Sequence, residues 1–364
     1  MGRRGGFGAS DRIHPARDSR GSGRRLGGFQ VIEDVLDVAR NGERFLVACH
    51  RRPDADSLGS ALGLIHTLRA IGKEAALFMP EQIPNSLLFL MDGEKGLPKI
   101  PDGVRYDATW VMDIAAKALL PPGFPTRDVT GPVVIIDHHH AHDDIGDIVY
   151  RDTDAAATGE VVVRLIDGLG LKSLPEGSAT PLYAAIVSDT GGFRYATTRP
   201  ATLRLGARLV EEGADPWHVA YQLFERWEPA RLRLLSAIIA TLEMAFDGRV
   251  AIMRVTREML EICDADDDMV EGMVNYARRV EGAEIGALLW EWRMPDVAGG
   301  HIETKVSLRS RGDADVSVIA AALNGGGHRA AAATQLNVTI DQAEERLRAE
   351  LVKYFGCDSP VGDG

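Results

Sequence analysis

The sequence predicts an α/β protein, with an N-terminal domain built on a parallel sheet and a smaller C-terminal domain of mixed α/β structure. Three observations predict this class. From about residue 29, short apolar runs alternate with segments of helical spacing, which is typical of a parallel sheet with crossover helices. Three of these runs end on Asp or His. After about residue 242 the alternation starts again over a shorter stretch, which indicates a second domain.

Four apolar runs predict the strands of the N-terminal domain. The strands are expected at 43–50 (ERFLVACH), 74–79, 108–113 and 132–137 (PVVIID), with helices at 57–72, 158–170, 180–193 and 201–216. His50, Asp113 and Asp137 end the first, third and fourth strands. Because ligands bind outside the carboxyl ends of parallel strands, these side chains are expected to meet at one edge of the sheet.

The remainder of the chain predicts a connector, a second domain and two tails. A catalytic domain at 29–215 is followed by a helical connector at 216–242 and a domain at 243–355, with strands at 249–256, 284–293 and 301–310 and helices at 267–280 and 315–323. Residues 1–28 and 356–364 are expected to be tails. The first tail is rich in Arg and Gly and predicts a disordered basic segment, with a nucleic-acid-binding arm or an organellar presequence as alternatives.

Composition narrows the function classes. The chain has 364 residues, of which 45% are hydrophobic and 26% charged, and its formal net charge is -12. An acidic protein is poorly suited to clamp long nucleic acid by phosphate neutralisation, whereas a small phosphate-bearing substrate is compatible with it. The sequence contains no apolar run of membrane-spanning length, no disulfide framework and no CxxC zinc motif. We therefore expect a cytoplasmic protein with no membrane partner.

The first constellation of candidate metal ligands follows the first strand, in CHRRPDADSLGS. It contains His50, Asp54 and Asp56. Two carboxylates at this spacing can face different cations, each binding through one or two oxygens. A turn with a helix N-cap is the alternative for the Asp pair. The histidine on the strand tip favours a metal site.

Two further constellations end the third and fourth strands. Asp113 is a candidate ligand, with a helix N-cap or an ion-pair partner as the alternative. The run Asp137, His138 and His139 is more specific, because imidazole is a common metal ligand and consecutive histidines have no common structural use at a strand end. An incidental polar loop is the alternative here. Asp137 can also fix a histidine tautomer by accepting its ring N–H.

Together these residues predict a site for two divalent cations. Mixed carboxylate and imidazole ligands suit Mn²⁺, with Fe²⁺, Co²⁺, Zn²⁺ and Mg²⁺ as competitors. Two metal ions close together are the usual arrangement for displacement at phosphorus, because they acidify a water molecule and neutralise charge on the phosphate oxygens. Hydrolysis of a phosphate ester is therefore the predicted reaction class.

A fourth constellation lies in the predicted second domain. Gly325, Gly326 and Gly327 stand in a row before His328, and Arg309 lies in SLRS (307–310). Consecutive glycines let backbone N–H groups approach a phosphate, and the His and Arg side chains can donate to it. A flexible loop before an Ala-rich helix is the alternative. No GK[ST] follows the glycines, which excludes a Walker-type nucleotide loop.

Taken in order, these motifs resemble a known family. HRRPDADSLGS, VMD, IIDHHH and VSDTGGF, followed by SLRS and NGGGHRAAAA, resemble the DHH phosphoesterase superfamily with its DHH-associated C-terminal domain. Within it, the chain is similar in size to the nanoRNase/pAp phosphatase group, which degrades very short RNA and dephosphorylates 3'-phosphoadenosine 5'-phosphate (pAp). The resemblance implies an N-terminal parallel-sheet DHH domain and a smaller, mixed DHH-associated domain.

The resemblance also implies roles for individual residues. One Mn²⁺ would be held by His50, Asp54 and Asp113, and the other by Asp56, Asp113, His138 and Asp189, with Asp113 bridging. Asp189 is a candidate only through the resemblance. His139 would contact the scissile phosphate or protonate the leaving oxygen. The substrate's terminal phosphate or nucleotide would be held by Arg309, Ser310, Gly326, Gly327 and His328, and a hinge would close the second domain over it.

The predicted function is a two-metal phosphoesterase that hydrolyses short oligonucleotides to mononucleotides, with pAp 3'-phosphatase activity as a second reaction. Its partners are then short RNA or DNA oligonucleotides or pAp, and a homodimer is compatible with the pattern. Two alternatives stay open: hydrolysis of a linear dinucleotide or another small phosphate ester, and a non-catalytic nucleotide-binding sensor. The complete set of ligands counts against the sensor, because a degenerate binder would be expected to lose costly buried acids.

Overall fold

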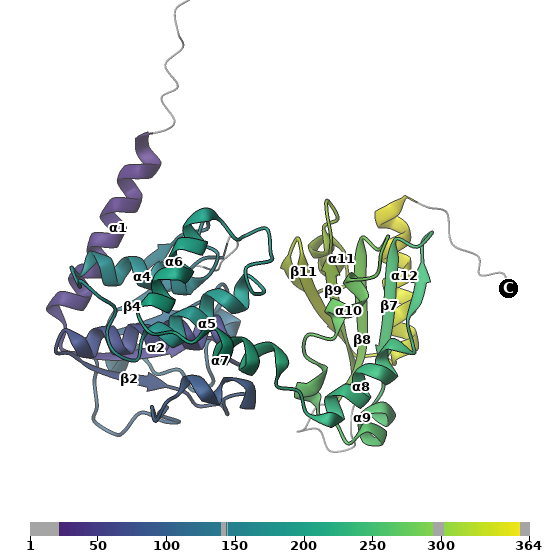
Figure 1. The fold of residues 1–364 in the computed structure, drawn as a ribbon, viewed down its shortest axis with the longest axis horizontal. Coiled ribbons are helices and arrows are strands. Elements are labelled where there is room, and N and C mark those ends of the chain that lie inside the picture. Colours follow the sequence, from purple (N-terminus) through teal and green to yellow (C-terminus); the bar gives the residue numbers. More distant parts are fainter. Residues whose placement is uncertain (1–21, 140–142, 144, 294–301, 357–364) are drawn as a thin grey trace, which may run out of the picture. The chain divides into compact units, whose positions relative to one another are not determined.

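The structure is a computed structural model that describes residues 22–139, 143, 145–293 and 302–356. The chain divides into two compact units, residues 1–226 and 227–364, each with its own sheet (Figure 1). The predicted fold class is confirmed. The division falls inside the segment 216–242 that we predict as a connector. The predicted tails lie mostly outside the described residues, although helix α1 (Ser22–Asn41) begins within the first of them.

The first unit contains a five-stranded parallel sheet of order β2-β1-β3-β4-β5. Its strands are β1 (Arg44–Cys49), β2 (Glu74–Phe78), β3 (Ala108–Met112), β4 (Val133–Asp137) and β5 (Ile148–Arg151). The strand order reverses between β1 and β3, which is where open α/β sheets bind ligands. The sequence prediction does not include β5, a four-residue edge strand that is half-buried throughout and shows no alternation.

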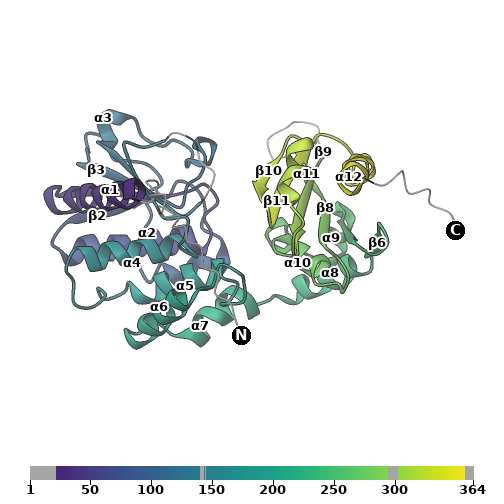
Figure 2. The same cartoon turned by 90° about the horizontal axis from the view of Figure 1, so that it is seen from above.

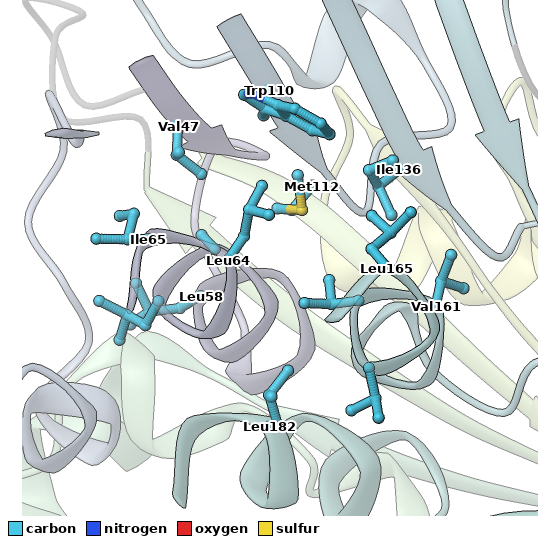
Figure 3. Close-up of a cluster of buried hydrophobic side chains, with 14 of the residues drawn as sticks. Val47, Leu58, Leu64, Ile65, Trp110, Met112, Ile136, Val161, Leu165 and Leu182 are labelled. Atoms are coloured by element: carbon cyan, nitrogen blue, oxygen red, sulfur yellow. The ribbon is translucent and has the colours of Figure 1, made fainter. Parts of the chain in front are cut away.

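Helices cover both faces of this sheet unequally. The larger core lies between one face and α1, α2 (Ala55–Ala70), α4 (Thr158–Gly168), α5 (Ala179–Asp189), α6 (Pro200–Glu211), α7 (Pro216–Ala220), the 3₁₀ segment η1 (Asn85–Leu90) and the π-helix η3 (Tyr221–Glu225). The short helix α3 (Arg127–Thr130) and the segment that follows the 3₁₀ turn η2 (Lys117–Leu119) pack on the opposite face. Helices α2, α4 and α5 lie together below the sheet in Figure 2. In the core between them, Met112 and Ile136 of the strands approach Leu64 and Leu165 of the helices (Figure 3).

Two glycines set how closely α2 and α5 approach each other. A Cβ atom at Gly59 would lie 2.3 Å from the carbonyl oxygen of Pro181, and one at Gly63 would lie 2.6 Å from the Leu182 side chain. A side chain at either position would push α5 away from α2. Because α5 ends at Asp189, this close packing fixes the position of that carboxylate relative to the loop before α2.

The second unit contains a six-stranded mixed sheet of order β10-β11-β9-β8-β7-β6, in which only β7 and β8 are parallel. Its strands are β6 (Glu243–Ala245), β7 (Val250–Val255), β8 (Ile285–Arg293), β9 (Ile302–Ser310), β10 (Gly326–His328) and β11 (Ala331–Leu336). Its helices are α8 (Pro229–Ile239), α9 (Arg257–Cys263), α10 (Val274–Arg278), α11 (Val316–Ala322) and α12 (Ile340–Phe355), with the 3₁₀ segment η4 (Asp267–Val270). Helices α11 and α12 pack on one face, and α8 to α10 on the other.

Two details of this unit differ from the sequence prediction. The helix expected at 267–280 is divided into η4 and α10, because Gly272 between them has a φ of +82°, outside the helical region. The glycine run is not a simple loop, and the alanines after it do not form a helix. Gly326–His328 and Ala331–Leu336 pair as an antiparallel hairpin, and the second strand also pairs with β9.

Within the described ranges, no helix combines the length and the apolar composition needed to cross a bilayer.

Candidate metal centre

The predicted ligands do meet at the carboxyl edge of the first sheet. His50 follows β1, Asp113 follows β3, and His138 and His139 follow β4, and these three strands are neighbours. Asp113 has a φ of +57°, a left-handed conformation that Asp tolerates better than most residues. This conformation turns the chain sharply at the end of β3.

The first group of ligand atoms surrounds His50. Its Nε2 lies 3.5 Å from Oδ1 of Asp54 and 3.7 Å from Oδ2 of Asp113. Its Nδ1 lies 2.9 Å from the carbonyl oxygen of Arg51 and donates to it, which leaves the Nε2 lone pair facing the two carboxylates. Asp54 is placed by its capping of α2, where Oδ1 accepts from the backbone N–H of Ser57 at 2.8 Å.

The second group surrounds His138. Its Nε2 lies 3.3 Å from Oδ2 of Asp189, 3.6 Å from Oδ1 of Asp113 and 3.7 Å from Oδ2 of Asp56. This nitrogen is buried and makes no hydrogen bond of good geometry within the described residues. A buried nitrogen facing three carboxylates needs a cation or a proton between them. The residues therefore fit a divalent cation.

The carboxylates of this second group are held by the N-terminus of α4. Asp56 is fully buried and accepts from the backbone N–H groups of Thr158 at 2.7 Å and Gly159 at 3.0 Å, and from the Ser60 hydroxyl at 3.1 Å. The Thr158 hydroxyl donates to Oδ1 of Asp113 at 2.9 Å. The positive end of the helix thus compensates part of the buried negative charge.

Burial and mutual repulsion raise the pKa values of two acids in the cluster. Burial, together with the negative charges of Asp54 and Asp189, raises the pKa of Asp113 to about 6. Burial and the charges of Asp113 and Asp189 also raise the pKa of Asp56 well above its usual range. Buried acids that repel one another in this way are typical of sites that bind divalent cations.

The pKa values of His50 and His138 are also raised, which favours the positively charged form of both rings. Burial lowers the pKa of His50, but the hydrogen bond and charge of Asp54 outweigh this and raise it to about 9. Burial likewise opposes protonation of His138, but Asp189, Asp56 and Asp113 raise its pKa to about 10. Without a cation, protons on these two rings balance the acids. A divalent cation would supply the same positive charge.

His139 has different neighbours. Its Nδ1 lies 2.8 Å from Oδ1 of Asp137 and 3.4 Å from Oδ1 of Asp113. Asp137 is fully buried and also accepts from Nε of Arg151 at 2.8 Å. Burial raises the pKa of Asp137, but its bonds to His139 and Arg151 outweigh this and lower it. Asp137 thus orients the His139 ring, although Asp113, His138 and His139 are also close enough to share a cation.

The predicted substrate residues all lie in the second unit, and none belongs to the cluster above. Arg309 and Ser310 end β9, where Arg309 is opposite Ala331 and Ala331 is opposite His328. The Ser310 hydroxyl is buried and donates to the carbonyl oxygen of Arg329 at 2.9 Å. The side chain of His328 lies outside the described part of the structure.

The three glycines of the hairpin differ in the space around them. A Cβ atom would lie 2.3 Å from the Ala333 carbonyl oxygen at Gly325 and 2.5 Å from the Ala331 carbonyl oxygen at Gly327. At Gly326, no atom lies within 4 Å of the Cβ position. Only the middle glycine therefore faces open space.

Sequence reasoning missed the residues that hold the ligands in place. Thr158 and Gly159 donate to the cluster from the start of α4, and Arg151 pairs with Asp137 from β5. The pair Thr-Gly before an apolar helical run was a weak available signal, because N-terminal backbone N–H groups bind anions. Arg151 gave no signal, because its strand was not predicted.

Comparisons with known proteins agree with this geometry. The family model described as DHH family, N-terminal domain, matches residues 44–186. The bifunctional oligoribonuclease and PAP phosphatase NrnA of Thermus thermophilus is 36% identical, and the match covers 88% of this chain and 92% of that protein. The cyclic-di-AMP phosphodiesterase PdeA of Listeria monocytogenes is 26% identical over 90% of this chain, which spans only 50% of PdeA.

A solved structure extends the comparison to the fold of both units. An exopolyphosphatase-related protein from Bacteroides fragilis has a TM-score of 0.81 at 24% identity, and the match covers 90% of this chain and 96% of that chain. This likeness shows the fold alone. The resemblance predicted from the sequence motifs is confirmed by the match to NrnA over nearly its whole length and by the family model. The chain therefore belongs to the DHH family of metal-dependent phosphoester hydrolases.

Proposed function

We propose that this protein hydrolyses short oligonucleotides to mononucleotides and also removes the 3'-phosphate of pAp. The observation that carries the proposal is the buried Nε2 of His138, which faces the carboxylates of Asp56, Asp113 and Asp189. Such a group is a ready ligand set for a cation that binds phosphate oxygens. The substrate class is supported by the similarity to NrnA, which is named an oligoribonuclease and PAP phosphatase.

Two cations fit the ligand groups. One would be held by His50, Asp54 and Asp113, and the other by Asp56, Asp113, His138 and Asp189, with Asp113 shared. Mixed oxygen and imidazole ligands favour Mn²⁺, with Mg²⁺, Co²⁺, Fe²⁺ and Zn²⁺ as competitors. Such ions, when bound, neutralise the phosphate group and acidify a water molecule.

His139 is the proposed general acid of the chain itself. Its Nδ1 donates to Asp137, so its Nε2 is the atom that would pass a proton to the leaving oxygen. Burial lowers the pKa of His139, but the hydrogen bond and charge of Asp137 outweigh this and raise it. The shift favours the protonated ring, which is the form a general acid needs. Asp137, in turn, is held by Arg151 and positions the ring.

The second unit would bind a phosphate of the substrate. Arg309 stands on β9 beside the glycine hairpin, and Gly326 opens to free space. A guanidinium group and exposed backbone N–H groups are suited to a phosphate. We assign Arg309, Ser310, Gly325, Gly326, Gly327 and His328 to this role. The formal net charge of -12 favours short substrates, because long nucleic acid needs an extended positive surface.

Cyclic-di-AMP phosphodiesterases give a second candidate substrate class. PdeA matches 90% of this chain, so a small dinucleotide belongs in the same assay. Hydrolysis of one phosphodiester bond in a cyclic dinucleotide gives a linear dinucleotide, which resembles a two-nucleotide RNA. The ligand groups act only on the phosphate, so they do not discriminate between these substrates.

The test is a time course with purified protein and Mn²⁺ on 5'-labelled RNAs of two, five and twenty-four nucleotides. Phosphate release from pAp is measured in parallel, with cyclic-di-AMP as a further substrate and a chelator as the control. We expect fast, chelator-sensitive hydrolysis of the two shorter RNAs and of pAp, and slow hydrolysis of the longest RNA. Equal rates at all lengths, or no loss with chelator, would contradict the proposal.

A further inference from the structure

Three large aromatic side chains are exposed on the surface of the first unit. Trp217 of α7 is 65% exposed, and Tyr221 and Phe224 of η3 are 41% and 37% exposed. Trp217 and Tyr221 stand four residues apart, so they share one face of the helical segment, and Phe224 follows on the π-helical turn. Val219 of the same segment is fully buried, so the opposite face makes the packing contacts. Exposed rings grouped in this way usually mark a binding surface.

One end of this aromatic row lies beside the segment that follows Asp189 of the cluster. Helix α7 packs on α5, the helix that ends at Asp189 (Figure 1). A Cβ atom at Gly192, three residues after Asp189, would lie 4.0 Å from Cε2 of Phe224. The Phe224 ring therefore lies beside the segment that follows α5. From there the row leads away through Tyr221 to Trp217, whose ring centroids are 5.9 Å apart.

Two arginines accompany the row. Nε of Arg194 would lie 3.8 Å from a Cβ atom at Gly192, the position that Phe224 also approaches, and it donates to the Gly191 carbonyl oxygen, while the Arg194 residue is exposed. Arg226 follows η3, and its Nη1 donates to Gln222 at 3.0 Å. Aromatic rings with flanking arginines suit single-stranded nucleic acid, because bases stack on the rings and phosphates pair with the guanidinium groups. An apolar protein partner would gain nothing from these charges.

The backbone of this segment is also unusual. Tyr221–Glu225 is a π-helix, and Arg226 donates its backbone N–H to the Tyr221 carbonyl oxygen at 2.7 Å, five residues back. Such turns are rare and occur frequently at functional sites. The π-turn changes the angular spacing of the rings on the segment.

From these observations we propose that Phe224, Tyr221 and Trp217 stack the bases of nucleotides that follow the scissile phosphate. Phe224 lies seven helical steps from Trp217, so by the rise per helical residue the row is roughly 10 Å long. It has room for two or three bases, and further nucleotides would gain nothing from it. This inference rests on the proposed function and adds a cause for the preference for short substrates.

The test compares variants Trp217→Ala and Tyr221→Ala with wild type on RNAs of two to five nucleotides and on pAp. The KM for the four-nucleotide RNA should rise about tenfold in each variant, in line with the loss of one stacked base. The KM for pAp, which has no nucleotide beyond the scissile phosphate, should rise much less. Trp217→Phe should restore most of the affinity. Leu203→Ala is the matched control, because Leu203 is 53% exposed on α6 of the same unit.

An RNA with abasic residues only from the third nucleotide on, the positions that Tyr221 and Trp217 would stack, makes the test independent of protein folding. Wild type should bind this RNA as weakly as the Trp217→Ala/Tyr221→Ala double variant binds normal RNA, and the double variant should not discriminate between the two. Equal effects on pAp and RNA, or full discrimination by the double variant, would overturn the proposal. A shift from dimer to monomer with unchanged KM would instead assign the rings to a second copy of the chain. If wild type hydrolyses neither RNA nor pAp, the proposed function fails, whereas the abasic comparison still reads out binding.

Discussion

The metal-ligand cluster of the first unit and the glycine hairpin of the second unit are built in opposite ways. In the cluster, charged side chains are buried and held by several hydrogen bonds. In the hairpin, three consecutive residues are glycines and have no side chain. Asp56 accepts three hydrogen bonds inside the first unit. Gly326 has open space where a Cβ atom would stand. In the function proposed above, the cluster holds charges at fixed separations, and the hairpin leaves room for a phosphate. Changes in the cluster should therefore stop the chemistry, while changes in the hairpin should weaken binding.

The largest effect is expected for Asp113. Its two oxygens face His50 on one side and His138 on the other, so Asp113→Ala removes a ligand from both proposed cation positions. The value of kcat should fall on the order of 10³-fold or more. Single-turnover rates with Mn²⁺ on a two-nucleotide RNA measure the effect, and Asp113→Asn keeps the shape of the side chain. Near-normal rates in a folded variant would show that Asp113 is not shared by two ions.

Metal binding should depend strongly on pH. The pKa of His50 is raised to about 9 and that of His138 to about 10, so both rings carry protons at pH 7 when no cation is bound. A cation needs their lone pairs and displaces these protons, so its affinity rises with pH, by about tenfold per pH unit for each proton released. Asp113, with a pKa of about 6, should steepen the dependence in the acid range.

Titration calorimetry with Mn²⁺ at pH 6.5, 7.5 and 8.5 measures this dependence. Two buffers with different ionisation enthalpies give the number of protons released at each pH. We expect a release of nearly two protons at pH 7.5 when both histidines become ligands. An affinity that is constant across this range would mean that neither histidine is a ligand.

The next effect concerns the orientation of His139. Asp137→Asn keeps the size of the side chain but removes the charge that Nδ1 of His139 faces. We expect kcat to fall by about 10- to 100-fold with little change in KM. Because Asp137 raises the pKa of His139, its loss should also move the alkaline limb of the pH profile to lower pH. Asp147→Asn is the control, since Asp147 accepts from the backbone N–H of Val133 at the start of β4, whereas Asp137 stands at its end.

Much of the first unit could be predicted from the sequence, because its strands are buried on both faces and end on polar residues. His50, Asp113 and Asp137 could be placed at one edge from strand endings alone, since parallel strands share a direction. Asp189 could not, because it ends a helix, and only family resemblance singled it out. The close packing of α2 and α5 at Gly59 brings it to the cluster, and no local pattern encodes that contact.

The second unit was harder to predict for a physical reason. Gly326 and Ala331 have weak strand preference, and their strand conformation comes from pairing with β9, which is distant along the sequence. Residues of this kind show neither the apolar alternation nor the turn chemistry on which strand prediction depends. The chemistry of Arg309 and the glycines could still be inferred, because it depends on residue type and not on the conformation of the hairpin.

The smallest effects are expected for the glycines of the hairpin. Two substitutions distinguish a glycine that strand pairing requires from one that leaves space for a ligand. Gly327→Ala places a Cβ atom 2.5 Å from the Ala331 carbonyl oxygen and should destabilise the second unit by about 1–3 kcal/mol. Gly326→Ala meets no neighbour, so the unfolding transition of the second unit should not change. If Gly326 approaches a phosphate, its variant should still raise the KM for pAp, by about tenfold for the loss of one good contact. Calorimetry and KM measured on both variants test this, and an unchanged KM in Gly326→Ala would remove the hairpin from the substrate site while leaving the metal cluster untouched.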